Sequence, residues 1–257
     1  MTGFGCPRRH VAECASTNDL ARAWAADASD PAPHGALVTA DFQTRGRGRR
    51  GRGWDAAPGQ SALMSFVLRP NLSLADAWQI GFLAALAAAE ALRGMGLDAR
   101  LKWPNDVLLH GAKVAGVLVE TILTPPELGA GGRSSPPALG AGGQMAAIAG
   151  IGVNVNQPGF HAADYAYPPT SLRLVTGREQ SVEEIIQAVA AALGRWDALY
   201  RQGGFAPVLS TCQTYLAVGA IVRRGVETAT LTGLTSDGHA RVRLSDGTFA
   251  EWTALEG

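Results

Sequence analysis

Hydrophobic residues recur along the chain at spacings that predict three helices. Between residues 181 and 200 they recur every three or four positions, and Ser181 with Glu184 has the form of a capping box. Residues 16–19 likewise fit the start of a helix, and the Ala, Leu and Arg residues that follow favour it. The stretch 74–94 is rich in alanine and ends in glycine, which predicts a buried helix.

Runs of apolar and β-branched residues between these helices predict strands. Pro104, Asn105 and Asp106 form a turn signal between two of the shorter runs. The segment 124–143 is rich in Pro, Gly, Ser and Ala and buries too little apolar surface to offset its ordering entropy, so we expect a mobile loop there. The expected strands of this part of the chain are 36–41, 62–68, 99–103, 107–109, 114–121 and 145–155.

The pattern changes after about residue 215. Short alternating runs follow one another, and Ser-Asp-Gly turns at 236–238 and 245–247 separate some of them. This pattern predicts a small all-β, barrel-like domain. We therefore expect two domains, 1–212 and 213–257, and an α+β fold overall. The strands expected in the second domain are 221–223, 229–231, 240–244 and 248–252.

Composition narrows the class of protein. The 257 residues are 47% hydrophobic and 17% charged with a formal net charge of +0, which indicates a folded protein without a global attraction to nucleic acid or anionic membranes. Residues 1–14 contain no apolar core of the signal-peptide type, and the longest apolar stretch, 80–92, is too short for a bilayer. The three cysteines form neither a metal-type pair nor a disulfide framework. We expect a cytoplasmic protein.

The loop 44–54, with the sequence TRGRGRRGRGW, concentrates positive charge. Five arginines alternate with glycines between residues 45 and 52. Glycine lets the backbone approach a ligand closely, and arginine supplies planar, always-charged donors that suit phosphate and carboxylate. The loop therefore predicts a site that an anion, such as a nucleotide phosphate, would order.

Other interpretations of this loop compete. Residues 46–51 match a dinucleotide-binding fingerprint, but that motif requires a helix directly afterwards and a strand follows here. A kinase glycine loop would need HRD and DFG elements, which the sequence lacks. A nucleic-acid-binding patch and a merely solvated charged loop stay open at this point, although no stacking aromatics alternate with the arginines.

Two further clusters carry candidate chemistry. Lys113 opens an apolar strand, where its charge is costly unless an anion or a carboxylate offsets it. Asp106 offers oxygen atoms either to Mg²⁺ or to Lys113. In the third cluster, Gly150 and Gly152 predict a strand that something approaches closely, and Asn154 lies at its end. Taken alone, the stretch KWPND at 102–106 is better explained as a turn with a half-buried Trp103, and the third cluster as a core strand that ends in an Asn turn.

Together and in this order, these pieces resemble the biotin–protein ligase family. The matching stretches are STND at 16–19, ADFQTRGRGRRGRGW at 40–54, KWPNDVLLHGAKVAGVLVET at 102–121 and GIGVNVN at 150–156. The resemblance implies a catalytic domain related to class II aminoacyl-tRNA synthetases, a mixed sheet with helices on one side, followed by an SH3-like barrel. It also implies the monofunctional type, without the N-terminal DNA-binding domain.

The resemblance further implies a role for individual residues. Catalysis falls to Lys113, Asp106 and Arg49, and Asp106 is also the candidate metal ligand. Biotin would be bound by Ser16, Thr17, Asn18, Gln43, Gly46, Arg47, Gly48, Arg49, Lys113, Gly116, Leu118 and Gly150. ATP would be bound by Arg49, Arg52, Trp54, Asn105, Asp106, Lys113 and Asn154.

The implied reaction is ATP-dependent formation of biotinyl-5′-AMP, with Mg²⁺, followed by transfer of biotin to a lysine of a biotin carboxyl carrier protein. A lipoate ligase of the same superfamily and a nucleic-acid-binding module are the alternatives. We expect neither nucleic acid nor a membrane as a partner, and homodimerisation stays open.

Overall fold

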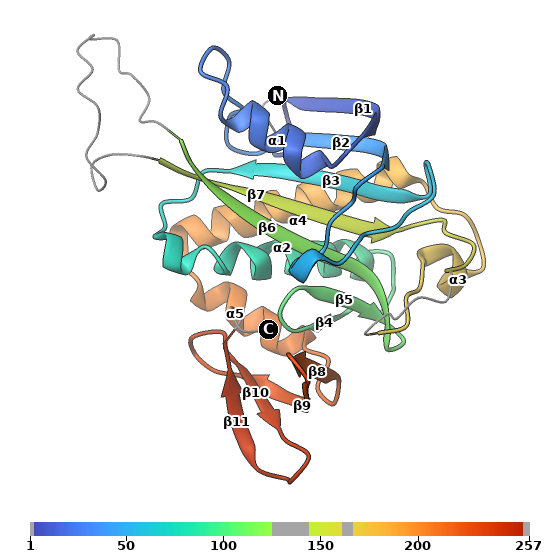
Figure 1. Ribbon diagram of the computed structural model, residues 1–257, viewed down its shortest axis with the longest axis vertical. Coiled ribbons are helices and arrows are strands. Elements are labelled where there is room, and N and C mark those ends of the chain that lie inside the picture. Colours follow the sequence, from blue (N-terminus) through green and yellow to red (C-terminus); the bar gives the residue numbers. More distant parts are fainter. Residues whose placement is uncertain (1–2, 125–143, 161–166, 254–257) are drawn as a thin grey trace.

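The computed structural model describes residues 3–124, 144–160 and 167–253, and its main feature is a mixed seven-stranded sheet (Figure 1). The strand order is β1-β2-β3-β7-β6-β5-β4. β1 runs parallel to β2, and the other neighbouring pairs are antiparallel. The strands are β1 Arg8–Cys14, β2 Ala36–Gln43, β3 Ser61–Leu68, β4 Arg100–Lys102, β5 Asp106–Leu109, β6 Ala112–Thr124 and β7 Gln144–Asn154.

Helices cover both faces of this sheet, which corrects the expectation of helices on one side. Side chains alternate between the faces, so β3 is buried along its whole length. On one face Ala149, Ile151 and Val153 of β7 join a core with α2 (Gln79–Arg93) and α4 (Val182–Gly203). On the other face Ile148 joins a smaller core with α1 (Thr17–Ala25).

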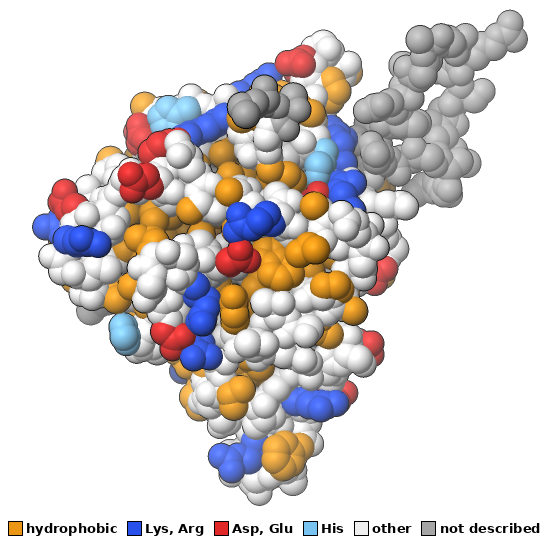
Figure 2. Space-filling view, turned by 180° about the vertical axis from the view of Figure 1, so that it is seen from behind, with side chains coloured by type: hydrophobic (Ala, Val, Ile, Leu, Met, Phe, Trp, Pro, Cys, Tyr) orange, Lys and Arg blue, Asp and Glu red, His pale blue; other side chains and the backbone are white. Residues whose placement is uncertain are grey.

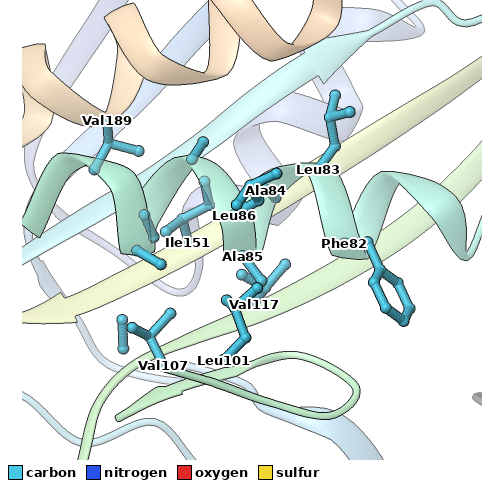
Figure 3. Close-up of a cluster of buried hydrophobic side chains, with 14 of the residues drawn as sticks. Phe82, Leu83, Ala84, Ala85, Leu86, Leu101, Val107, Val117, Ile151 and Val189 are labelled. Atoms are coloured by element: carbon cyan, nitrogen blue, oxygen red, sulfur yellow. The ribbon is translucent and has the colours of Figure 1, made fainter. Parts of the chain in front are cut away.

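α2 lies between the sheet and α4, and its alanines allow close packing on both sides. Figure 3 shows Leu86 of α2 near Ile151 of the sheet, with Val189 of α4 on the opposite side of the helix. Leu86 is fully buried. Glu90, the acidic residue of α2, accepts hydrogen bonds from the side chains of Arg195 and Trp196 of α4. The charge inside this interface is therefore paired.

The C-terminal residues form a separate antiparallel sheet in the order β11-β10-β9-β8, around the fully buried Trp252. Its strands are β8 Ile221–Arg224, β9 Glu227–Leu234, β10 Ala240–Arg243 and β11 Phe249–Trp252. The expected boundary at 212/213 falls inside α5 (Ala206–Tyr215), and the first strand of the C-terminal sheet begins after this helix, at Ile221.

The C-terminal sheet is tied to the turn at 103–106. Trp103 is 3% exposed, and its indole N–H donates to the carbonyl of Gly238 at 3.1 Å. The N–H of Ala217 donates to the carbonyl of Leu101 at 2.8 Å. The alternative of a half-buried Trp103 is therefore wrong, because the indole is buried where this turn is anchored to the C-terminal sheet.

Several elements differ from the sequence prediction. The helix expected over 74–94 begins at Gln79, after the 3₁₀ turn η2 (Leu74–Asp76). The strand β1 and the helices α3 (Leu172–Thr176) and α5 were not predicted. The mobile loop expected over 124–143 lies outside the described residues except at Thr124, the last residue of β6. Ser181 caps α4 as expected, because its hydroxyl accepts from the N–H of Glu184 at 3.2 Å.

The surface agrees with the neutral composition. Figure 2, seen from behind the view of Figure 1, shows acidic and basic side chains interspersed with hydrophobic ones on that face. No helix within the described part of the chain is long and apolar enough to span a membrane.

Leu86→Ala is expected to lower the free energy of unfolding by about 3 kcal/mol, because it opens a cavity between α2, α4 and the sheet. Urea unfolding measures this loss. Leu199→Ala, on the exposed side of α4 at 45% exposure, is the matched control and should cost less than about 0.5 kcal/mol. Equal losses in the two variants would contradict the assigned core.

Candidate functional site

A cavity of about 290 Å³ lies on the α1 face of the main sheet. In Figure 1 the segment between β2 and β3 runs across this face toward β6. The start of α1, this segment, the turn at 102–106 and strands β3, β6 and β7 form the walls. The lining residues are Ser16, Thr17, Asn18, Gln43, Arg47, Gly48, Arg49, Arg52, Gly53, Trp54, Asp55, Leu63, Met64, Lys102, Asn105, Asp106, Lys113, Gly116, Val117, Leu118, Gly150, Ile151, Gly152, Asn154, Phe160, Tyr167 and Pro169.

One end of the cavity is a hydrogen-bonded polar cluster. The backbone N–H and the hydroxyl of Thr17 both donate to Gln43 Oε1, at 2.7 and 3.0 Å. Ser65, fully buried in β3, lies 2.6 Å from Asn18 Oδ1 and 2.8 Å from Thr17 Oγ1. Because these bonds occupy Gln43 Oε1, the NH₂ end of that amide is the part left to a ligand. Ser16 precedes α1 at the N-cap position, and its side chain makes no capping bond.

Glu120 of β6 orients the amide of Asn18. Asn18 Nδ2 donates to Glu120 Oε2 at 2.7 Å, and Arg22 and Arg47 lie 2.8 and 3.3 Å from the same carboxylate. A carboxylate only accepts hydrogen bonds, so the NH₂ group must face Glu120 and the oxygen must face Ser65. The side-chain oxygen of Asn18, which accepts hydrogen bonds, is thereby fixed on the cavity side of β3.

The first half of loop 44–54 is anchored to α1. Arg47 makes two hydrogen bonds to the carboxylate of Asp19, at 2.7 and 2.8 Å. These bonds with Arg47 hold the pKa of Asp19 below its ordinary value. The loop closes on itself through the N–H of Gly48, which donates to Arg52 O at 2.7 Å, and that of Trp54, which donates to Gly46 O at 3.0 Å.

Glycines make room for two of the cavity side chains. A Cβ at Gly150 would lie 2.4 Å from Asn18 Oδ1, and one at Gly152 would lie 2.6 Å from Cε2 of Trp54. At Gly116 a Cβ would meet both Lys113 and Trp54 at 3.0 Å. The expectation that something approaches this strand closely is confirmed, and the approaching groups are an amide and an indole of the same chain.

The other end of the cavity carries excess positive charge. Asp106 lies 2.6 Å from Nζ of Lys113 and 3.3 Å from Nζ of Lys102. Burial alone would raise the pKa of Asp106, but the two ammonium groups outweigh it and hold that pKa below its ordinary value. Arg49 and Arg52 also line this cavity, so one carboxylate stands among four cations. Such a site favours an anion of several charges.

Two polar atoms in the cavity wall lack a hydrogen-bond partner within the described residues. They are Asn154 Oδ1 and Trp54 Nε1, both buried. The other end of the Asn154 amide donates to the carbonyl of Thr170 at 3.0 Å. A buried acceptor and a buried donor without partners are costly, which is typical of a site completed by a ligand.

The donor set does not fit a resident metal ion. Across residues 3–124, 144–160 and 167–253, no three His, Cys, Asp or Glu side chains gather in a group that could hold one. Both oxygens of Asp106 are engaged by ammonium groups, and the binding of Mg²⁺ by Asp106 stays a prediction. Its place in the structure is that of a counter-ion.

The predicted site residues otherwise come together as expected. Every candidate residue lines the cavity except Gly46, where a Cβ would lie 2.4 Å from the carbonyl oxygen of Trp54. Gly46 therefore permits the closure of the loop. Sequence reasoning missed Lys102 and Tyr167, which also line the cavity. The position of Lys102, four residues before Asp106, could have indicated it, whereas nothing in the pattern indicated Tyr167.

A scan against protein families matches residues 12–128 to the biotin/lipoate A/B protein ligase family. A biotin–(acetyl-CoA-carboxylase) ligase of Paracoccus denitrificans is 41% identical over 178 residues, 67% of this chain and 67% of that protein. The bifunctional ligase/repressor BirA of Bacillus subtilis is 31% identical over 209 residues, 80% of this chain. That match spans 59% of the length of the Bacillus protein.

Solved structures give the same similarity. The biotin protein ligase of Aquifex aeolicus in complex with biotin and ATP superimposes with a TM-score of 0.72 at 25% identity, over 98% of this chain and 95% of that one. The biotin protein ligase of Leishmania major in complex with biotinyl-5-AMP, at 21% identity, shares the fold with a TM-score of 0.61 over 96% of this chain and the whole of its own.

Gly150→Ala is expected to lower the free energy of unfolding by about 1–3 kcal/mol, because the added methyl displaces the buried Asn18 amide. Chemical denaturation provides the measurement. Gly233→Ala is the matched control, since its Cβ would have no neighbour within 4 Å and should leave stability unchanged. If Gly150→Ala is as stable as the wild type, the packing of Asn18 on this strand is wrong.

Proposed function

This chain belongs to the biotin protein ligase family, and on that premise we propose that it activates biotin with ATP as biotinyl-5′-AMP and transfers the biotin to a lysine of an acceptor protein. The observation that carries the proposal is the convergence of loop 44–54 and Lys113 on one cavity. A polar cluster lies at one end of that cavity and an excess of cations at the other. This arrangement suits a ligand in which a neutral polar ring is linked to a carboxylate that forms an anhydride with a phosphate.

The polar cluster supports a ureido ring as the group recognised. A ureido group has a carbonyl acceptor and two N–H donors, and the NH₂ of Gln43 and the hydroxyl of Ser16 are available to it. The dithiolane ring of lipoate has no comparable donor or acceptor. It would leave these polar groups unpaired, a cost that discriminates strongly against such a ligand. The geometry therefore favours biotin over lipoate.

The cationic end supports adenylation. The biotin carboxylate attacks the α-phosphorus of ATP, a carboxyl O–P bond forms, the bond to the β-phosphate breaks, and pyrophosphate leaves. Two anions must approach each other in this step. Lys113, Arg49 and Arg52 reduce their repulsion and stabilise the charge of the transition state. Mg²⁺ enters with ATP as part of the substrate, because the described residues hold no group of three His, Cys, Asp or Glu side chains that could bind it.

The second step transfers the biotinyl group. A neutral lysine amine of the acceptor attacks the carbonyl carbon, an amide bond forms, and AMP leaves while the amine loses a proton. We propose that Asn154, Asn105 and Trp54 bind the nucleotide, because two of their polar atoms are buried without partners. The indole of Trp54 lies on Gly116 and Gly152, so it must shift for a biotin tail to pass over Gly116.

The acceptor in this proposal is a biotin carboxyl carrier protein domain, and the reaction takes place in the cytoplasm without nucleic acid or a membrane. A nucleic-acid-binding role for the arginine loop is less favoured, because Arg47, Arg49 and Arg52 line the cavity.

The wild type is expected to convert biotin and ATP to biotinyl-5′-AMP, detected by mass spectrometry. Lys113→Ala should keep the fold and lose adenylation by about a hundredfold to a thousandfold, the cost of removing one transition-state cation. Arg243→Ala, an exposed residue of β10, is the control. Pyrophosphate release at a normal rate in Lys113→Ala would refute the role of this lysine.

Calorimetry with biotin and with lipoate separates the two ligands. We expect biotin to bind at least about a thousandfold more tightly, because only biotin satisfies the buried polar cluster. If lipoate binds more tightly than biotin, the proposed substrate is wrong, although the proposed adenylation chemistry is unaffected.

A further inference from the structure

Each lysine of the cavity wall lies over an aromatic ring. Nζ of Lys102 is 4.5 Å from the centre of the ring of Tyr167, and Nζ of Lys113 is 5.6 Å from that of Trp54. The two rings differ in how they are held. Trp54 belongs to the loop 44–54 and has to shift in the proposed reaction, whereas Tyr167 is held at both of its ends.

The backbone next to Tyr167 is bonded to the start of β6. The N–H of Lys113 donates to the carbonyl of Pro168 at 2.8 Å, and the N–H of Thr170 donates to the carbonyl of Lys113 at 2.8 Å. At the far end of the side chain, the N–H of Ile221 in β8 donates to the hydroxyl oxygen of Tyr167 at 3.1 Å. The ring is therefore held between the main sheet and the C-terminal sheet.

This ring faces an ammonium group whose other contacts are few. The side chain of Lys102 is 12% exposed, and its Nζ lies 3.3 Å from the carboxylate of Asp106. An ammonium group has three N–H donors. Asp106 accepts from one of them, and the negative face of the Tyr167 ring attracts a second. One donor remains for an anion in the cavity, and the ring determines where that donor points.

We infer that Tyr167 is a positioning residue, which holds the ammonium group of Lys102 where it binds the phosphates of ATP. The C-terminal sheet fixes the hydroxyl, the hydroxyl fixes the ring, and the ring fixes the ammonium group. The inference rests on the proposed function. A plain tether between the two sheets would need only the hydroxyl of Tyr167, whereas positioning of Lys102 needs the ring, so two variants of this residue separate the roles.

Calorimetry with Mg²⁺ and the α,β-methylene analogue of ATP, in which the bond that adenylation breaks is replaced, measures binding without the reaction. Tyr167→Leu removes the ring and is expected to weaken binding about tenfold, between the strengths of an exposed and a desolvated cation–π pair. Tyr167→Phe keeps the ring and should bind the analogue within about threefold of the wild type, because the cation–π pair persists. Both variants should bind biotin as the wild type does, since the polar cluster lies at the other end of the cavity.

A double-mutant cycle tests whether Tyr167 acts through Lys102. In the background of Lys102→Met, the change Tyr167→Leu should weaken binding of the analogue by less than about twofold, because the ammonium group that the ring positions is gone. Tyr215→Leu is the matched control. The guanidinium of Arg93 lies 4.4 Å from the centre of that ring, outside the cavity lining, so binding of the analogue should not change.

Three results would overturn the inference. The first is wild-type affinity for the analogue in a folded Tyr167→Leu. The second is an equal loss in Tyr167→Phe, which would assign the effect to the tether. The third is a loss of the same size when Lys102 is already replaced by methionine. If Tyr167→Leu fails to fold by circular dichroism, Tyr167→Met takes its place with the same expectations.

The proposed function fails separately. A wild type that binds neither biotin nor the ATP analogue removes the ligase assignment itself. A wild type that binds both, together with unchanged affinity in Tyr167→Leu, removes only the role inferred for Tyr167.

Discussion

The structure depends on an imbalance of charge in one cavity. Five basic and two acidic side chains line it, and Asp106, 13% exposed, is held between two ammonium groups at its cationic end. Like charges at close range repel one another and lose solvation, so a folded protein keeps them together only where the backbone fixes their positions and a ligand of opposite charge offsets this cost. The turn at 103–106 provides that geometry, because Trp103 is bonded to the C-terminal sheet. The small domain thus supports the site without lining it.

The opposite end of the cavity is balanced. Arg22 and Arg47 are matched by Asp19 and Glu120, so that the amide of Asn18 is oriented by a neutral network. A site with one neutral and one cationic end distinguishes the two ends of its ligand. It suits a ligand with an uncharged polar head and a tail whose acid becomes joined to phosphate. Arg47 connects the two ends, because it is anchored to α1 and belongs to the same loop as Arg49 and Arg52.

Much of this site follows from the sequence. The alternation of arginine and glycine predicts a cationic loop that approaches its ligand, and Lys113 at the start of an apolar strand predicts a charge that needs a partner. What the pattern omits is the pairing between strands. Lys102 becomes a site residue only because β4 sets it opposite Asp106, and a register is a property of the folded sheet.

The fold shows the same limit. β3 and β7 were predicted because both of their faces are apolar. β1 was not, because it is an edge strand whose Arg8, Arg9, His10 and Glu13 hide the strand pattern. The spacing of Gly150 and Gly152 indicated a close approach but not by which group, since Asn18 and Trp54 reach the strand from distant parts of the chain.

Amide hydrogen exchange with and without biotinyl-5′-AMP tests the central claim most directly. If the arginine loop and the lysine-bearing strand bind one ligand together, the adenylate slows exchange at residues 44–54 and at residues 113–118 in parallel, at the same ligand concentrations. Protection of one segment without the other, or of neither, would contradict the account of a shared site.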